Sequence, residues 1–132
     1  MNGYKGSDYS LEDFSEKDIR NIIANLAASG TTQHIPTIIS SPQERILKNL
    51  EIISKAINNS SDIKAAIPGI HIEGPFISSE EGPRGCHDPS FIREPDFEEF
   101  RQWQGAAESR IVMVTIAPER EGSTVAIRFF PK

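Results

Sequence analysis

A glutamate at the end of an apolar stretch is the first residue in this sequence that could do chemistry. Glu73 follows Ile70-His71-Ile72, in which both isoleucines are β-branched, and is followed at once by Gly74-Pro75. Because proline cannot donate a hydrogen bond to a strand ladder, we expect a buried strand that ends on Glu73. A carboxylate in that position can bind a metal ion or act as a general acid or base. It can equally be a solvated strand-end residue, and the spacing alone leaves both interpretations open.

Histidines and the cysteine are the next candidates. His71 lies two residues before Glu73 and therefore on the same strand face. Two ligands are too few for a zinc site, so we favour a core histidine. His87 lies in a long loop, where its ring can donate to a substrate oxygen or simply hold its own turn. Nothing in the sequence beside Cys86 would activate its thiol, and we interpret it as a small, half-buried residue. His34 stands on a predicted strand, and we expect a structural role for it.

Composition limits the class of protein. The chain has 132 residues, enough for one domain with a modest core. Its net charge is -5 and its basic residues form no run, so nucleic acid is not an expected partner. The apolar runs are too short to span a bilayer, and no export signal is visible. With one cysteine no internal disulfide can form, which fits a cytoplasmic location.

Alternating helix and strand patterns indicate an α/β fold. Residues 2–14 are polar and turn-rich and predict a loop. Strands are predicted over 31–39, 65–73 and 110–116, and Pro36 predicts a bulge or an early end in the first of them. Helices are predicted from a Ser15–Asp18 cap to about Gly30, from a Ser41 cap to about Ile57, over 96–104, and after Ser123. This order implies parallel strands joined by right-handed crossovers. The pattern does not decide between an open sheet and part of a closed (β/α)8 barrel.

Four sequence blocks resemble the N-acetylglucosamine-6-phosphate deacetylases of the amidohydrolase superfamily. They are NGYKG, ASGTTQHIPTIISSP, GIHIEGPFIS with RGCHDPSFIR, and VMVTIAPE, and they occur in the family's order. The resemblance implies a metal-dependent hydrolase that converts N-acetylglucosamine 6-phosphate to glucosamine 6-phosphate and acetate. It also implies a partial (β/α)8 TIM-type barrel with parallel strands. Residues 1–132 would run from the end of the first strand to the start of the fourth helix of this catalytic domain, without the family's small β-sandwich domain.

The resemblance assigns roles to individual positions. Glu73 corresponds to the family's metal ligand, while His87 and the backbone of Cys86 correspond to its substrate-binding segment. Asn2 stands where single-metal members have the last residue of Q-x-N, so one divalent ion per site, zinc or iron, is implied. Further histidine ligands and the catalytic aspartate are expected beyond Lys132. The resemblance therefore places no catalytic residue in this chain, and we expect the isolated chain to be inactive.

The implied partner is an amino-sugar phosphate, and the galactosamine analogue is an open alternative. The full-length protein is expected to be a homo-oligomer. A function of another class also stays open, namely a non-catalytic α/β module that binds a sugar phosphate. A complete flavodoxin-like domain is disfavoured, because the glycines match no phosphate-binding fingerprint.

Overall fold

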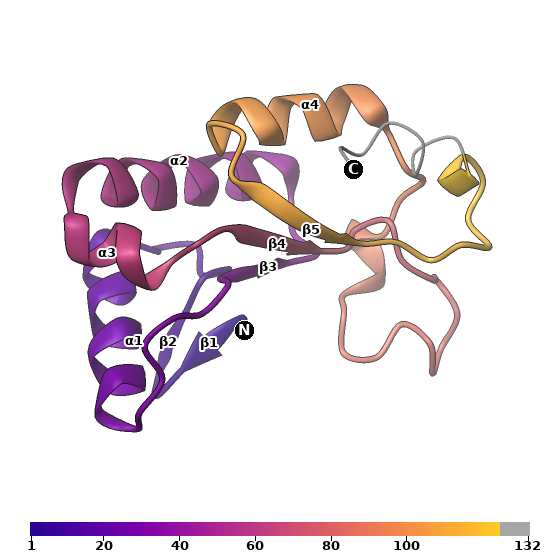
Figure 1. Ribbon diagram of the computed structural model, residues 1–132. Coiled ribbons are helices and arrows are strands. Elements are labelled where there is room, and N and C mark those ends of the chain that lie inside the picture. The colour runs from indigo at the N-terminus through magenta and orange to yellow at the C-terminus, as the bar shows by residue number, and fades with distance from the viewer. Residues whose placement is uncertain (125–132) are drawn as a thin grey trace.

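A parallel sheet organises residues 1–124, which are the residues that the computed structural model describes (Figure 1). Its strands are β3 (Thr37–Ile39), β4 (Ile70–Glu73) and β5 (Ile111–Thr115), and they lie side by side in chain order. Both pairings are parallel. The α/β class and the parallel strands predicted from the sequence are therefore confirmed.

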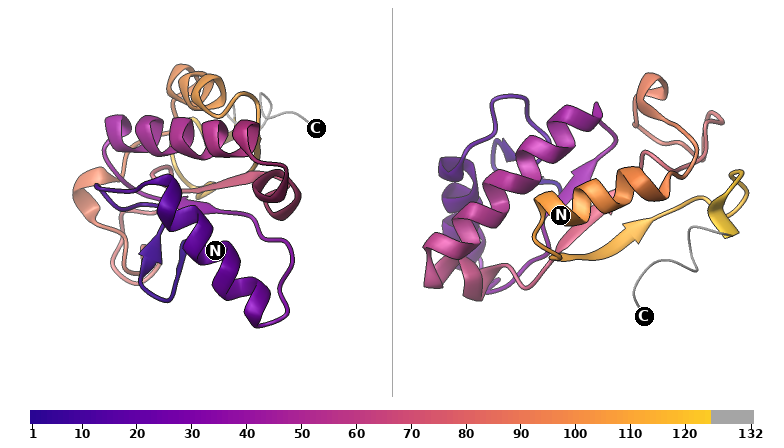
Figure 2. Two further views of the ribbon diagram at one scale, coloured as in Figure 1. Left: turned by 90° about the vertical axis from the view of Figure 1, so that its left-hand side faces the viewer. Right: turned by 90° about the horizontal axis from the view of Figure 1, so that it is seen from above.

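Helices connect the strands and cover one face of the sheet. The chain passes from β3 to β4 through α2 (Gln43–Asn59) and the short α3 (Ser61–Ala66), and from β4 to β5 through α4 (Phe97–Ala106). Figure 2 shows α2 and α4 side by side on the same face of the sheet, in agreement with the contacts between them. Helix α1 (Glu16–Ala28) packs beside α2.

The hydrophobic core lies between the sheet and these helices. Ile38 of β3 and Ile72 of β4 are fully buried, as is Trp103 of α4. Helix α2 contributes an apolar stripe that includes Ile46, Leu50 and Ile53. Burial of one strand face against helices is the arrangement that period-2 alternation in β4 predicts.

Local sequence signals explain where the helices begin. The Asp18 carboxylate accepts hydrogen bonds from the Ser15 backbone N–H at 3.0 Å and from the Ser15 hydroxyl at 2.7 Å, so the predicted cap of α1 is present. Asp96 caps α4 by accepting from the backbone of Glu98 and Glu99. Helix α2 begins at Gln43, one residue later than the sequence predicted.

Two predicted strands are shorter in the structure, the first because of its backbone and the second because a helix takes the place of its first residues. The strand predicted over 31–39 forms only from Thr37, because Pro36 lacks an N–H and the His34 N–H donates to the Ala66 carbonyl instead of a neighbouring strand. The strand predicted over 65–73 begins at Ile70. Its first residues belong to α3, which the Ser60 hydroxyl caps by accepting from the Ile63 N–H.

The predicted loop over 2–14 contains a small antiparallel hairpin. Strands β1 (Gly3–Tyr4) and β2 (Ser7–Asp8) pair across a two-residue turn. Lys5 and Gly6 in that turn both have positive φ, at 48° and 89°, as a type I′ hairpin turn requires. The helix predicted after Ser123 falls mainly on residues 125–132, outside the described residues.

A stacked aromatic pair should contribute strongly to stability. Phe76, in the loop after β4, is 1% exposed and stacks on Trp103 with ring centroids 5.1 Å apart. We expect Phe76→Ala to lower the free energy of unfolding by about 3–5 kcal/mol, because it leaves a cavity under the helix. Urea unfolding followed by far-UV circular dichroism measures this loss. The matched variant Phe97→Ala, at a position 38% exposed, should lose about 1 kcal/mol or less. Equal losses would contradict the assignment of Phe76 to the core.

Candidate functional site

The candidate site begins at the carboxyl end of β4. Ile70 and Ile72 point into the core, so His71 and Glu73 point to the face of the sheet that α2 and α4 do not cover. Glu73 is the last residue of the strand, and its side chain is 42% exposed. Gly74 follows with φ of 79°, which turns the chain away from the sheet. The predicted strand-end carboxylate is thus present.

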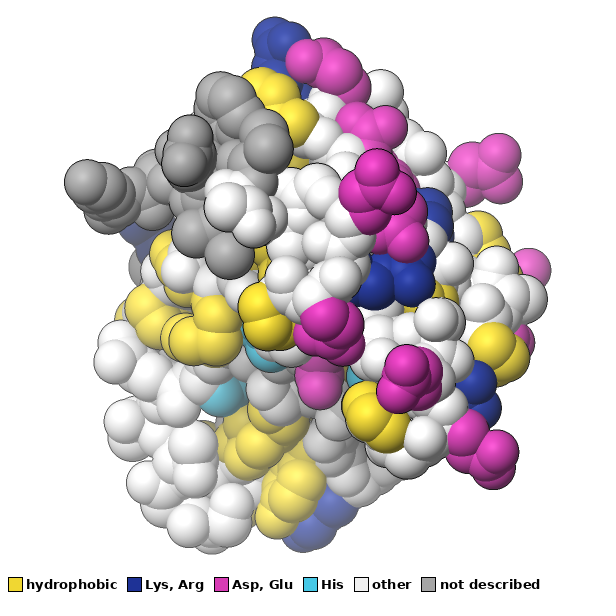
Figure 3. All heavy atoms as spheres, turned by 90° about the vertical axis from the view of Figure 1, so that its right-hand side faces the viewer, with side chains coloured by type: hydrophobic (Ala, Val, Ile, Leu, Met, Phe, Trp, Pro, Cys, Tyr) yellow, Lys and Arg dark blue, Asp and Glu magenta, His cyan; other side chains and the backbone are white. Residues whose placement is uncertain are grey.

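The loop after β4 brings His87 back to this strand end. The Nε2 atom of His87 lies 3.9 Å from Oε1 of Glu73, and its Nδ1 atom lies 2.8 Å from the Oγ atom of Ser40. The His87 side chain is only 11% exposed. Figure 3 views the carboxyl ends of the strands, where histidine and acidic side chains appear near the centre of the face. Two residues predicted from the sequence, Glu73 and His87, are therefore brought together.

Ser40 is the residue that sequence reasoning missed. It directly follows β3 and is 6% exposed. It belongs to one of the blocks that carry the family resemblance, but a serine after a strand is also a common turn residue. Only the alignment of β3 with β4 brings its hydroxyl to His87, 47 positions away in the sequence.

Cys86 lies at the surface beside His87. The prediction of a half-buried side chain is wrong, since the thiol is exposed. The loop turns at Gly85, where φ is 62°, and directs the next-but-one residue, His87, inward while Cys86 stays outside. An exposed side chain at this position agrees with the backbone role that the resemblance implies for Cys86.

His71 is held by both neighbouring strands. Its Nδ1 atom lies 3.2 Å from Oγ1 of Thr37, and its Nε2 atom lies 2.8 Å from Oγ1 of Thr115. Burial lowers the pKa of His71, while the charge of Glu73 partly raises it. With both ring nitrogens engaged in hydrogen bonds, His71 links β4 to both neighbouring strands. It is half-buried on the uncovered face of the sheet, so the prediction of a core histidine is wrong about its location.

His34 and Asn2 both contact Tyr9, and Met1 pairs with β3. The Tyr9 hydroxyl lies 2.7 Å from Nε2 of His34, and burial lowers the pKa of His34 to about 4. The Met1 carbonyl accepts the Thr37 N–H at 2.8 Å, and the Asn2 carbonyl accepts the Tyr9 N–H at 2.7 Å. The first residues of the chain therefore run beside β3. Asn2 itself is exposed.

The described residues supply an incomplete set of metal ligands. Within residues 1–124, no group of three or more His, Cys, Asp and Glu side chains is placed to hold a metal ion. Glu73 and His87 form a pair, and the hydrogen bonds of His71 keep it from joining them. A catalytic metal centre needs more protein ligands than this pair provides.

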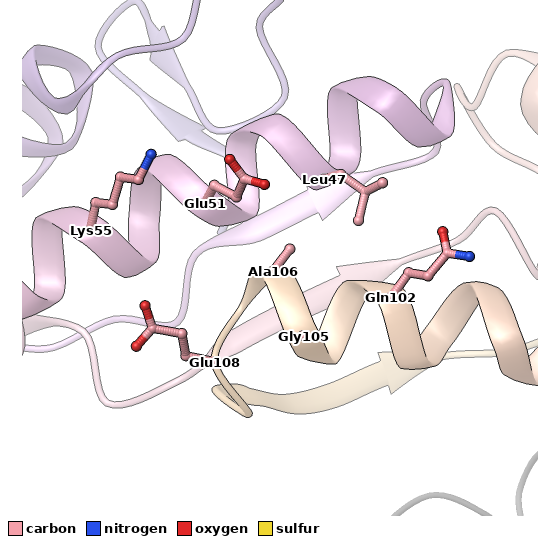
Figure 4. A pocket seen from close by; sticks show the side chains of 7 residues that line it. All are labelled: Leu47, Glu51, Lys55, Gln102, Gly105, Ala106 and Glu108. Atoms are coloured by element: carbon pink, nitrogen blue, oxygen red, sulfur yellow. The ribbon is translucent and has the colours of Figure 1, made fainter.

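A separate groove lies between α2 and α4, away from the strand ends (Figure 4). Its polar lining includes Glu51 and Lys55 of α2, Gln102 of α4, and Glu108 just after α4. The Glu108 carboxylate already binds Asn58 and Arg110. None of the residues singled out from the sequence lines this groove, so we do not assign the candidate site to it.

Within residues 1–124, no helix is long and apolar enough to cross a membrane.

Comparisons with known proteins find deacetylases that resemble this chain over nearly its whole length. No family model matches the chain. An N-acetylglucosamine-6-phosphate deacetylase from Caenorhabditis elegans is 34% identical over an alignment of 137 residues including gaps. This alignment covers 98% of this chain and 32% of that protein. The Bacillus subtilis deacetylase is 35% identical over 130 residues, which cover 97% of this chain and 32% of that protein. The resemblance to this deacetylase family is confirmed. The chain spans about a third of the length of these curated relatives.

Solved structures of these deacetylases have the same backbone arrangement. The crystal structure of the Mycobacterium smegmatis deacetylase is 29% identical, with a TM-score of 0.80 over 96% of this chain and 34% of that chain. A mutant of the same protein, solved in complex with N-acetyl-D-glucosamine-6-phosphate, is 30% identical with a TM-score of 0.80. The loop after β4 and the strand ends thus belong to a segment shared with these deacetylases.

Close packing makes Gly74 a sensitive position. A Cβ atom there would lie 2.2 Å from Oγ of Ser40, in addition to the unfavourable φ of 79°. We expect Gly74→Ala to lower the free energy of unfolding by about 2–4 kcal/mol and to break the Ser40–His87 hydrogen bond. Urea unfolding and the imidazole NMR signals of His87 measure the two effects.

Gly82→Ala is the matched control for Gly74→Ala. Gly82 lies in the same loop at φ of 99°, but a Cβ atom there would meet nothing within 4 Å. This variant should lose only the cost of the left-handed backbone, about 1–2 kcal/mol. It should also leave the His87 signals unchanged. Equal losses in the free energy of unfolding and equal His87 signals in the two variants would contradict the role of close packing between Gly74 and Ser40.

Stability should fall as the pH is lowered from about 6.5 to about 4, the interval between the unfolded and folded pKa values of His34. In that interval the unfolded chain binds more protons than the folded chain, because the folded pKa of His34 is depressed. The lowered pKa of His71 likewise makes the free energy of unfolding fall as the pH is lowered. Urea unfolding at pH 7 and pH 5 measures the effect. His34→Gln should reduce this pH dependence, and an unchanged dependence would argue against burial as the cause.

Proposed function

We propose that this chain is part of a deacetylase that hydrolyses N-acetylglucosamine 6-phosphate to glucosamine 6-phosphate and acetate. The pair formed by Glu73 and His87, at the carboxyl ends of parallel strands, carries the proposal. This is the end of the sheet where ligands bind in barrel enzymes. The chain matches about a third of the length of its deacetylase relatives. We therefore propose the activity for the longer enzyme of which such a segment forms part.

We further propose that residues 1–132 form part of the catalytic (β/α)8 barrel. Consecutive parallel strands with α2 and α4 on one face support this interpretation over a doubly wound sheet, whose two faces are both covered by helices. The Met1 carbonyl pairs with the Thr37 N–H on the far side of β3, where the end of a first barrel strand would lie. His71 and Glu73 would then face the barrel interior.

In the proposed enzyme, Glu73 is one ligand of a divalent ion, zinc or iron, with one ion per site. Such an ion would polarise the amide carbonyl and lower the pKa of water. The described residues do not complete its coordination, so we derive no reaction step through it. His87 presents Nε2 beside Glu73, where it can donate to an oxygen atom of the substrate, and the Cys86 backbone would contact the sugar. The remaining ligands and the catalytic aspartate would come from other parts of the longer enzyme.

The proposed partner is an amino-sugar phosphate. A related deacetylase that was solved in complex with N-acetyl-D-glucosamine-6-phosphate supports it. We propose a cytoplasmic, homo-oligomeric full-length enzyme that binds neither nucleic acid nor membrane. The net charge of -5 and the scattered basic residues are consistent with the lack of a nucleic-acid partner.

A non-catalytic module that binds a sugar phosphate is the second candidate. The incomplete ligand set within residues 1–124 favours it for the isolated chain. The two candidates differ in turnover. The module would bind N-acetylglucosamine 6-phosphate without ever releasing acetate, even in the longest polypeptide that carries this sequence.

The purified 132-residue chain should release no acetate from N-acetylglucosamine 6-phosphate, with or without added zinc or iron(II), because one carboxylate cannot hold a catalytic ion. An acetate assay and calorimetric metal titration measure activity and binding. Acetate release that a chelator stops would contradict this expectation.

In the longest polypeptide that carries this sequence, Glu73→Gln should lower kcat/KM by more than about 100-fold. Substitution of a residue that only hydrogen-bonds to a metal ligand already reduces metal affinity or activity about 10–100-fold. The matched control is Glu81→Gln, at an exposed position of the following loop, and it should keep its activity. Equal activity of the two variants would contradict the role proposed for Glu73.

A further inference from the structure

We propose that Ser40 is a positioning residue that fixes the tautomer and the orientation of the His87 ring. The inference rests on the proposed function, in which His87 contacts the substrate. It assigns Nε2 of His87 as a hydrogen-bond donor that points to the rim beside Glu73. The ligand class that fits such a donor is an oxygen acceptor, such as the carbonyl, hydroxyl or phosphate oxygen of an acylated amino-sugar phosphate.

The contact between Ser40 and His87 is partly buried and involves specific atoms. Ser40 is 6% exposed, and its Oγ atom lies 2.8 Å from Nδ1 of His87. A buried hydroxyl without a partner costs about 1–3 kcal/mol, so this hydrogen bond is strongly favoured over a ring turned elsewhere. Gly74 leaves the space for the hydroxyl, because a Cβ atom there would lie 2.2 Å from Ser40 Oγ.

Burial of the Ser40 hydroxyl decides the direction of this hydrogen bond. A neutral imidazole carries one proton, on either Nδ1 or Nε2. Within residues 1–124, the Ser40 Oγ atom has no other hydrogen-bond partner, and a buried O–H group that donates to nothing is costly, which favours the tautomer with the proton on Nε2. Nδ1 is then an acceptor, and the Ser40 hydroxyl donates to it. The same arrangement holds the ring with Nε2 toward the rim.

This arrangement separates two roles that a histidine could play. With Nδ1 occupied by the Ser40 proton and Nε2 protonated, neutral His87 has no free lone pair with which to remove a proton. It serves as a donor that orients a substrate oxygen. A general base would have to come from another residue of the enzyme.

The tautomer can be observed directly by long-range 1H–15N NMR of the imidazole rings in the longest polypeptide that carries this sequence. His87→Gln identifies the His87 signals. We expect the wild-type protein to show the Nε2–H tautomer. Ser40→Ala should show a mixture of tautomers, and Ser40→Thr, which keeps a hydroxyl, should restore the wild-type spectrum. In an activity assay, Ser40→Ala should lower kcat/KM about 10-fold or more, as loss of a positioning partner does.

The matched control is Ser54→Ala. Ser54 is 1% exposed on α2, and within the described residues its Oγ atom has no hydrogen-bond partner. This variant tests removal of a buried hydroxyl without touching His87, and it should leave the His87 spectrum and the activity unchanged.

The outcomes separate this inference from the proposed function. A wild-type spectrum with the proton on Nδ1, or an unchanged tautomer in Ser40→Ala, would overturn the role of Ser40. The wild-type spectrum and Ser40→Thr provide this test even where Ser40→Ala does not fold. If the tautomer depends on Ser40 but N-acetylglucosamine 6-phosphate leaves the His87 signals of the wild-type protein unchanged, the positioning role stands and the proposed substrate is wrong.

Discussion

The parallel pairing of β3 with β4 is the constraint on which the candidate site depends. Ile39 pairs with Glu73, so both strands end at the same edge of the sheet. Ser40 and Gly74 then leave the sheet side by side, close enough that any side chain on Gly74 would strike the Ser40 hydroxyl. A slip of one residue would turn Glu73 toward the helices and remove the carboxylate from the rim.

The loop after β4 is fixed at both of its ends, which allows His87 to return to the rim. Near its start, Phe76 stacks on Trp103 of α4. Near its end, Arg93 forms an ion pair with Glu99, whose side chain is 8% exposed. The backbone N–H of Arg93 donates to the Pro75 carbonyl at 3.2 Å. The contribution of a partly buried ion pair to stability depends on its geometry more than that of an exposed pair does. This pair joins the end of the loop to α4. These anchors sit on the helix side, while the residues proposed to bind ligand sit on the opposite side.

Two histidines on the same face of the molecule have different surroundings and therefore different roles. His71 is linked to β3 and β5 through both ring nitrogens, which reinforces the sheet behind Glu73. Within residues 1–124, the His87 ring hydrogen-bonds through Nδ1 alone and presents Nε2 beside the Glu73 carboxylate. This division leaves one carboxylate and one imidazole available at the strand ends. It is consistent with a segment that contributes part of a larger active site.

The sequence by itself determined the local features. β-Branched residues before Gly74-Pro75 predicted a strand ending on Glu73, and the Ser15–Asp18 pair predicted the start of α1, because both depend on neighbours in the chain. The sequence blocks that resemble the deacetylase family identified Glu73 and His87 as candidate site residues. The Ser60 cap that begins α3 is also local, although this helix was not predicted. Tertiary structure decided which distant groups meet: the His34 N–H donates to the Ala66 carbonyl rather than extending β3, and Ser40 comes to face His87, 47 positions away. Periodicity and spacing do not encode such contacts.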